Sequence, residues 1–147
     1  MQKLSFERHV GHSPERMLAL AWDVQSYPDF VPNCLAMEIT PEAGNENRCR
    51  ARMHIQFGPI SQAYTSLVTL DTNSSTVTAE ALDGPFSHLV SVWKLIPEGA
   101  GTLVRFDIDF ALRNPMLAAI AEPAFAAKQE EIIEAFVDEA GRRYARS

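Results

Sequence analysis

The stretch that decides the fold is Thr102-Leu103-Val104-Arg105-Phe106-Asp107-Ile108-Asp109-Phe110-Ala111-Leu112. Apolar and polar side chains alternate along it, which is the period of a strand with one face on a core and one face in water. Phe106, Ile108 and Phe110 are therefore predicted to face a buried layer. Asp107 and Asp109 share the opposite face with Arg105, so we interpret them as solvated carboxylates in preference to an acid–base pair.

Earlier segments of the chain also have strand composition, and turn residues such as Gly58-Pro59 and Asp83-Gly84-Pro85 separate them. The predicted strands are Leu4–Val10, Cys34–Ile39, Arg48–Phe57, Ile60–Leu70, Ser75–Leu82, Phe86–Ile96 and Thr102–Leu112. Short connections between consecutive strands favour antiparallel pairing. The meander therefore predicts a largely antiparallel sheet with one face in water and one face covered.

The first predicted helix lies between the first two strands. Ser13 is a good N-cap, and Pro14 suits the first helical position. Apolar residues then recur at helical spacing as far as Trp22. Pro28 and Pro32 are expected to stop this helix and to begin a loop.

The last segment, Pro115–Tyr144, is predicted to be a long helix with an apolar stripe. Pro123 is expected to kink or break it within its first turns. One face of the sheet can be covered only by this helix. The sequence therefore predicts a single α+β domain over residues 1–147.

Composition argues against several classes of protein. No apolar run approaches the roughly 18 residues of a membrane span, and the first residues lack the apolar core of a signal peptide. A net charge of −6 disfavours broad contact with nucleic acid. The expected location is the cytoplasm, with peripheral contact at the inner face of a bacterial membrane as a further option.

Residues that could carry catalysis or bind metal do not form a recognisable pattern. The sequence has no phosphate-binding loop, nucleophile elbow, dinucleotide fingerprint or zinc motif. The histidines are scattered, so no metal site and no cofactor are expected, and Cys34 and Cys49 are interpreted as inert thiols. The basic row Arg48, Arg50 and Arg52 is interpreted as a solvated strand face, with contact to RNA or anionic lipid as the alternative.

Small and aromatic side chains together suggest an apolar cavity. Alanines crowd the first half of the long helix at positions Ala118, Ala119, Ala121, Ala124, Ala126 and Ala127. Small side chains opposite a curved sheet can leave volume unfilled, and hydroxyls of Tyr64, Ser66 and Ser87 would suit the polar head of an apolar ligand. Close packing of the helix through its alanines is the competing interpretation.

Aromatic and apolar residues also gather in the run after the first helix. Pro28 and Pro32 hold Tyr27, Phe30 and Val31 on a segment expected at the surface. These side chains either cap the core or form a gate that faces a ligand or a bilayer.

Several motifs in this order resemble those of the coenzyme Q-binding proteins, within the START and polyketide-cyclase superfamily. They are Asp23, Tyr27-Pro28, Phe30, Pro32, Cys34, Phe57-Gly58, Tyr64-Thr65-Ser66, Asp83-Gly84-Pro85-Phe86, Leu89, Trp93, Phe106, Phe110, Ala135-Phe136 and Ala140. Two positions depart from the family pattern, since Asn33 stands where the family often has Trp and Leu67 where it often has Arg.

The resemblance implies a helix-grip fold of the START and Bet v 1 type, in which a curved antiparallel sheet surrounds a long C-terminal helix. It implies non-catalytic binding of ubiquinone or a similar isoprenoid quinone, in support of respiration and quinone synthesis. The residues expected to bind the ligand are Tyr27, Phe30, Val31, Phe57, Tyr64, Ser66, Phe86, Leu89, Trp93, Phe106, Phe110 and Phe136. The same superfamily includes a bacterial toxin that blocks ribosomal subunit association, which is the alternative function, and a cyclase-type enzyme is the third.

Overall fold

The computed structural model describes residues 2–57 and 60–144, without the side chains of residues 2, 57 and 60. The predicted turn at Gly58-Pro59 lies outside the described residues. The elements in chain order are β1 (Gln2–Val10), α1 (Pro14–Trp22), the 3-10 helix η1 (Val24–Asp29), β2 (Cys34–Glu42), β3 (Asn45–Phe57), β4 (Ile60–Asp71), β5 (Thr76–Ala81), β6 (Phe86–Glu98), β7 (Gly101–Leu112) and α2 (Pro115–Tyr144).

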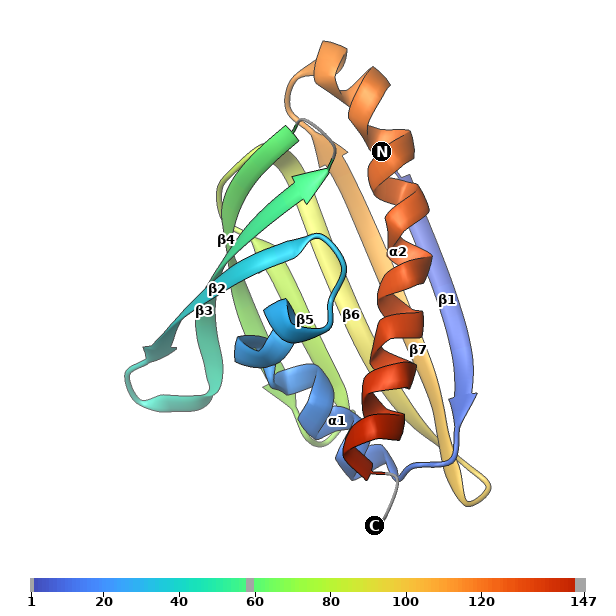
Figure 1. The fold of residues 1–147 in the computed structure, drawn as a ribbon. Coiled ribbons are helices and arrows are strands. Elements are labelled where there is room, and N and C mark those ends of the chain that lie inside the picture. The colour runs from blue at the N-terminus through green and yellow to red at the C-terminus, as the bar shows by residue number, and fades with distance from the viewer. Residues whose placement is uncertain (1, 58–59, 145–147) are drawn as a thin grey trace.

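All the described strands form one antiparallel sheet in the order β1-β7-β6-β5-β4-β3-β2. Each strand pairs with its neighbour in sequence except β1, which pairs with β7. The sheet curves, and α2 runs along its concave side, where it packs against β1 and β7 (Figure 1). This is the helix-grip fold, and the predicted α+β architecture is confirmed.

The alternation along β7 sets which face of the sheet is buried. Phe106, Ile108 and Phe110 are 3%, 5% and 0% exposed beneath α2. Asp107 and Asp109 lie on the outer face, where the Asp107 carboxylate pairs with Arg105 at 3.0 Å. The prediction that both carboxylates lie on the outer face is confirmed, and both are half-buried there, with Asp109 Oδ1 buried.

The first helix begins where the sequence predicts, and it ends before the two prolines that were expected to stop it. The Ser13 hydroxyl accepts a hydrogen bond from the Arg16 N–H at 3.3 Å, and Pro14 is the first helical residue. The helix ends at Trp22 because Asp23 leaves the helical conformation, with φ −79° and ψ 60°. The prolines therefore do not stop it. Pro28 lies inside η1, so part of the expected loop is a 3-10 turn.

The long helix is continuous from Pro115 to Tyr144, so Pro123 does not break it, and of the predicted kink or break only the kink stays a prediction. Asn114 caps it, because its Oδ1 accepts hydrogen bonds from the N–H groups of Met116 and Leu117 at 2.9 and 3.2 Å. Pro123 and Ala119 are both exposed. Water can therefore reach the carbonyl group that the proline leaves without a donor, and the helix tolerates the interruption.

Candidate functional site

Two small internal cavities lie between the helices and the concave face of the sheet. The one beneath α2, here called the helix-side cavity, has a volume of about 80 Å3. The other lies beneath η1, against strands β2 to β6, and has a volume of about 70 Å3; we call it the inner cavity. The side chains that line both cavities are Tyr27, Met53, Tyr64, Leu89, Ser91 and Trp93. These side chains are the partition between the two cavities.

The structure brings most of the predicted ligand-binding residues to these cavities. Those that line one cavity or both are Tyr27, Val31, Tyr64, Ser66, Leu89, Trp93, Phe106 and Phe136. Phe30 is half-buried and packs edge-on against Tyr27 and Phe136 without lining either cavity. Phe86 and Phe110 are core residues that both pack against Phe125. The side chain of Phe57 lies outside the described residues.

The serine predicted to serve the ligand at the start of β6 is the wrong one. Ser87 is exposed and donates a hydrogen bond to the Ala111 carbonyl of β7 at 3.3 Å. A β-bulge between Phe86 and His88 shifts the alternation, so that Phe86 and Leu89 both point inward. Ser91, two residues beyond Leu89, consequently lines both cavities.

The alanines in the first half of α2 do not line the cavities, which corrects the reason given for expecting one. Ala119, Ala124 and Ala127 are exposed, and Met116 and Ile120 are 81% and 75% exposed. The helix residues that reach the helix-side cavity are Phe125, Gln129, Ile132 and Phe136. The volume therefore arises from the curvature of the sheet opposite large side chains.

Gln129 is a cavity residue that the sequence reasoning missed. It is 1% exposed and its Nε2 donates to the Phe125 carbonyl at 3.0 Å. A signal for it was present, because Gln129 is the one polar member of the i, i+4 series Phe125, Gln129, Ile133. A polar residue on the buried stripe of an amphipathic helix indicates a specific partner.

The run Tyr27–Val31 lies against the core. Tyr27 and Val31 are 8% and 7% exposed, and the Tyr27 hydroxyl donates to the Ala21 carbonyl. The Tyr27 ring meets the Phe136 ring edge-on, with 5.2 Å between centroids. The segment therefore caps the core in the described conformation, and its side chains form one wall of the helix-side cavity.

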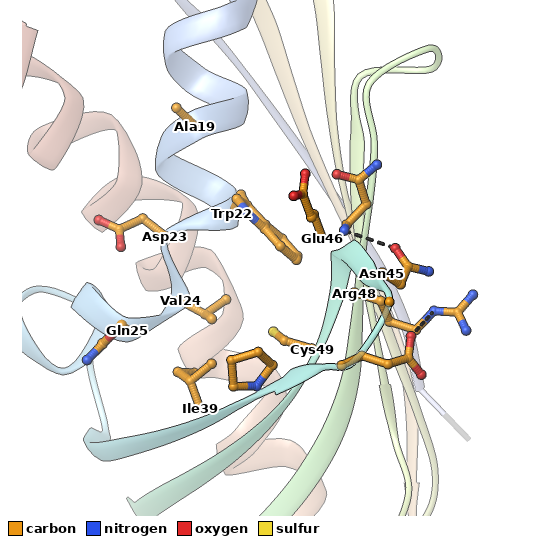
Figure 2. Close-up of a pocket in the computed structure, with 14 residues that line it drawn as sticks. Ala19, Trp22, Asp23, Val24, Gln25, Ile39, Asn45, Glu46, Arg48 and Cys49 are labelled. Atoms are coloured by element: carbon orange, nitrogen blue, oxygen red, sulfur yellow. Dashed lines mark hydrogen bonds and ion pairs between the residues drawn. The ribbon is translucent and has the colours of Figure 1, made fainter.

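A third hollow opens at the surface beside the inner cavity. It has a volume of about 900 Å3 and lies between the α1–η1 junction and the hairpin that joins β2 to β3; we call it the hairpin groove (Figure 2). Trp22, Val24, Ile39 and Cys49 face one another across it. Val24 lines both this groove and the inner cavity, so its side chain forms the wall between them.

The described residues that line the two internal cavities include no charged side chain. Their titratable groups are Tyr27, Tyr64 and Cys34, and all three are shifted toward the neutral form. Burial raises the pKa of both tyrosines and raises the pKa of the Cys34 thiol to about 11. Burial also raises the pKa of Cys49. The cavities therefore present hydroxyl, amide and thiol groups that stay neutral at physiological pH.

The described residues contain no group of three or more His, Cys, Asp or Glu side chains that could hold a metal ion. Within the same residues, no helix has the length and apolar character that crossing a membrane requires. On the outer face of β3, the Arg50 and Arg52 side chains are exposed, and Arg48 lies 3.6 Å from the Glu42 carboxylate.

The sequence matches a family model described as polyketide cyclase / dehydrase and lipid transport, over residues 10–137. The chain belongs to this family. Among curated members, it is 32% identical over 138 residues to the ribosome association toxin RatA of Rickettsia prowazekii, a match that covers 90% of this chain and 93% of the toxin. It is 28% identical over 142 residues to the mitochondrial coenzyme Q-binding protein homolog B of Xenopus laevis, of which it spans 57%.

Solved structures share the fold of this protein. The Zhui aromatase/cyclase from a Streptomyces species superposes with a TM-score of 0.86 at 18% identity, over 99% of this chain and 98% of that one. An 18 kDa protein from Caulobacter crescentus superposes with a TM-score of 0.80 at 24% identity, over 99% of both chains. At these identities the likeness establishes the fold alone.

Proposed function

We propose that the protein binds ubiquinone or a similar isoprenoid quinone in the space between the sheet and α2, as a carrier or chaperone that does not transform its ligand. The observation that carries the proposal is a pair of adjoining cavities lined by Tyr64, Trp93, Phe106 and Phe136. Aromatic walls with a few neutral polar groups suit a flat, mostly apolar ring. Similarity to a coenzyme Q-binding protein supports the choice of ligand.

The cavity volumes imply that the ligand must open the protein. Cavities of about 70 and 80 Å3 are each smaller than the roughly 150 Å3 that admits a benzene ring. A quinone ring therefore requires the two cavities to join. Met53 lies in the partition between them and is unbranched and flexible, so it is the side chain most easily displaced.

The isoprenoid tail needs a path to solvent, and the hairpin groove provides one. Val24 separates the inner cavity from the groove, where Trp22 and Ile39 offer apolar surface. Burial of apolar area contributes about 25 cal/mol per Å2. A few isoprene units would therefore supply micromolar affinity after the costs of association.

The side chains that line the two cavities support binding of the ligand without a chemical reaction. The described residues around both cavities offer no acid or base that titrates near neutral pH, because Tyr27, Tyr64 and Cys34 all have raised pKa values. Aldol and dehydration chemistry of the cyclase type needs such groups next to the substrate. We therefore favour binding over catalysis.

The deciding experiment is mass spectrometry of lipid extracted from the protein purified from its own host, followed by titration of the delipidated protein with decylubiquinone. Recovery of a quinone and saturable binding are the expected results. A delipidated, folded protein that binds neither decylubiquinone nor decylubiquinol would refute the proposal.

Pick-up of a quinone from a bilayer would use the exposed apolar start of α2. Met116 and Ile120 are 81% and 75% exposed, and the helix carries no charge from residue 115 to residue 121. The double variant Met116→Ser, Ile120→Ser should reduce co-sedimentation with phospholipid vesicles. Binding of soluble decylubiquinone should stay unchanged, because neither residue lines a cavity.

The second candidate function is that of a ribosome-directed toxin, and full-length similarity favours it. The chain spans 93% of the Rickettsia prowazekii toxin but 57% of the Xenopus laevis coenzyme Q-binding protein. Arg50 and Arg52 provide an exposed basic row for such a surface, although the net charge is −6. Induced expression should then arrest growth and deplete joined ribosomes, and Arg50→Glu should relieve the arrest. Normal ribosome profiles at high expression would exclude this function.

A further inference from the structure

Two side-chain amides line the helix-side cavity from different elements. Gln129 comes from α2, and Asn33 comes from the turn that precedes β2. Each uses its nitrogen in a hydrogen bond to a backbone carbonyl: Gln129 Nε2 donates to Phe125 at 3.0 Å, and Asn33 Nδ2 donates to Gln56 at 2.8 Å. A carbonyl oxygen only accepts, so these bonds fix which end of each amide is nitrogen and leave the amide oxygens for other partners.

Neither amide oxygen receives a hydrogen bond from the described residues. Asn33 Oδ1 is buried without a partner, and the hydrogen bond that Gln129 makes uses its nitrogen. Buried acceptors without a donor are rare and costly. Asn33 also has a left-handed backbone, with φ 68°, which is uncommon outside glycine. The cavity wall thus holds two amide oxygens to which a ligand can donate, and the cost of a buried acceptor without a donor applies to that of Asn33.

We propose that these two oxygens select a ring that carries hydroxyl donors, namely the reduced quinol over the oxidised quinone. The inference rests on the proposed function. A quinone offers only acceptor oxygens, which leave the amide oxygens unpaired. A quinol hydroxyl donates to an amide oxygen and can still accept from a neighbouring N–H. The hydroxyl groups of Tyr64 and Ser91 serve either form, because they both donate and accept.

The expected selectivity follows from the cost of a buried acceptor left without a donor. Pairing one such acceptor should favour the quinol by about tenfold or more in dissociation constant. The same preference should raise the midpoint potential of the bound quinone–quinol couple by about 30 mV for each tenfold ratio of the two dissociation constants, because the reduced form is the one stabilised.

The experiment compares decylubiquinol with decylubiquinone under anaerobic conditions, followed by tryptophan fluorescence, since Trp93 lines both cavities. The quinol should bind at least tenfold more tightly, and its dimethyl ether, which lacks the donors, should lose that advantage. Gln129→Met should narrow the difference between the two affinities, because it removes one acceptor for a quinol hydroxyl. Gln62→Met, at an exposed position that lines neither cavity, should leave the selectivity unchanged.

Further measurements keep the inference testable if Gln129→Met fails to fold. Asn33→Gly removes the other amide at a position whose left-handed backbone glycine adopts freely, and it should also reduce selectivity. Equal affinity for the two redox forms, an unshifted midpoint potential, or selectivity that is undiminished in both folded variants, Gln129→Met and Asn33→Gly, would each overturn the inference and leave quinone binding standing. Failure of both forms to bind would overturn the inference together with the proposed function.

Discussion

Replacement of Ser91 by valine separates the stability of this protein from its capacity to bind a ligand. Ser91 lines both internal cavities, and its hydroxyl makes no hydrogen bond within the described residues. Valine puts two methyl groups into unfilled volume, and its branched side chain suits a strand. Each buried carbon contributes about 0.8 kcal/mol, so the free energy of unfolding should rise by about 1–2 kcal/mol.

The assay has two arms, thermal denaturation and quinone titration. For a chain of this length, 1 kcal/mol corresponds to a shift of about 2–4 °C in Tm, so Tm should rise by roughly 3–6 °C. Decylubiquinone affinity should fall at least tenfold, because the joined cavity can no longer accept the ring. Ser5→Val is the matched control, since Ser5 is exposed on the outer face of β1 and should change neither quantity. A destabilised Ser91→Val variant that still binds quinone would refute both the cavity assignment and the site.

Three further outcomes are expected. Hydrogen bonding to Arg143 lowers the pKa of Glu139 in the folded protein. The stability from this pair is therefore complete above the ordinary glutamate pKa and is lost as pH falls through the lowered value, and Glu139→Gln should remove that acid dependence from denaturation curves between pH 6 and pH 3. Burial raises the pKa of Cys34 to about 11, so at pH 8 roughly a thousandth of the Cys34 thiols are ionised and reaction with iodoacetamide should be slow. Reaction at the rate of an unfolded chain would contradict the burial of Cys34. Gly84→Ala should cost about 2–4 kcal/mol, because φ there is +90° and the new Cβ would lie 2.5 Å from the Cβ of Tyr64; an unchanged denaturation midpoint would contradict that geometry.

Local periodicity was sufficient to predict the sheet and the direction of most of its side chains. Phe106 and Phe110 are buried because each strand residue points opposite to its neighbour, which the sequence displays directly. The same rule failed at Ser87, where one extra residue in a bulge reversed the alternation. A bulge depends on the pairing partner as much as on the strand itself, so the sequence of β6 alone does not reveal it.

The long helix shows a second limit. Its boundaries follow from Pro115 and the apolar stripe, but which part of it contacts the sheet depends on how far the strands extend beside it. The alanine-rich half carries residues as exposed as Met116, so its composition reflects helix propensity more than packing. Gln129 was recognisable in principle, since a polar residue on a buried stripe is unusual, but only the fold placed it at a cavity.

The way α2 covers the sheet determines how the protein can open to admit a ligand. Its backbone hydrogen bonds lie within the helix, and it is held at its flanks by side chains, as in the pairs of Arg8 with Glu130 and Glu134. Opening between two strands would break a ladder of backbone hydrogen bonds. Displacement of α2 breaks none within the sheet. Detachment of one intact helix should therefore govern access of the ligand to the cavities. Native-state hydrogen exchange should show strand amides that stay protected while the ligand enters and leaves.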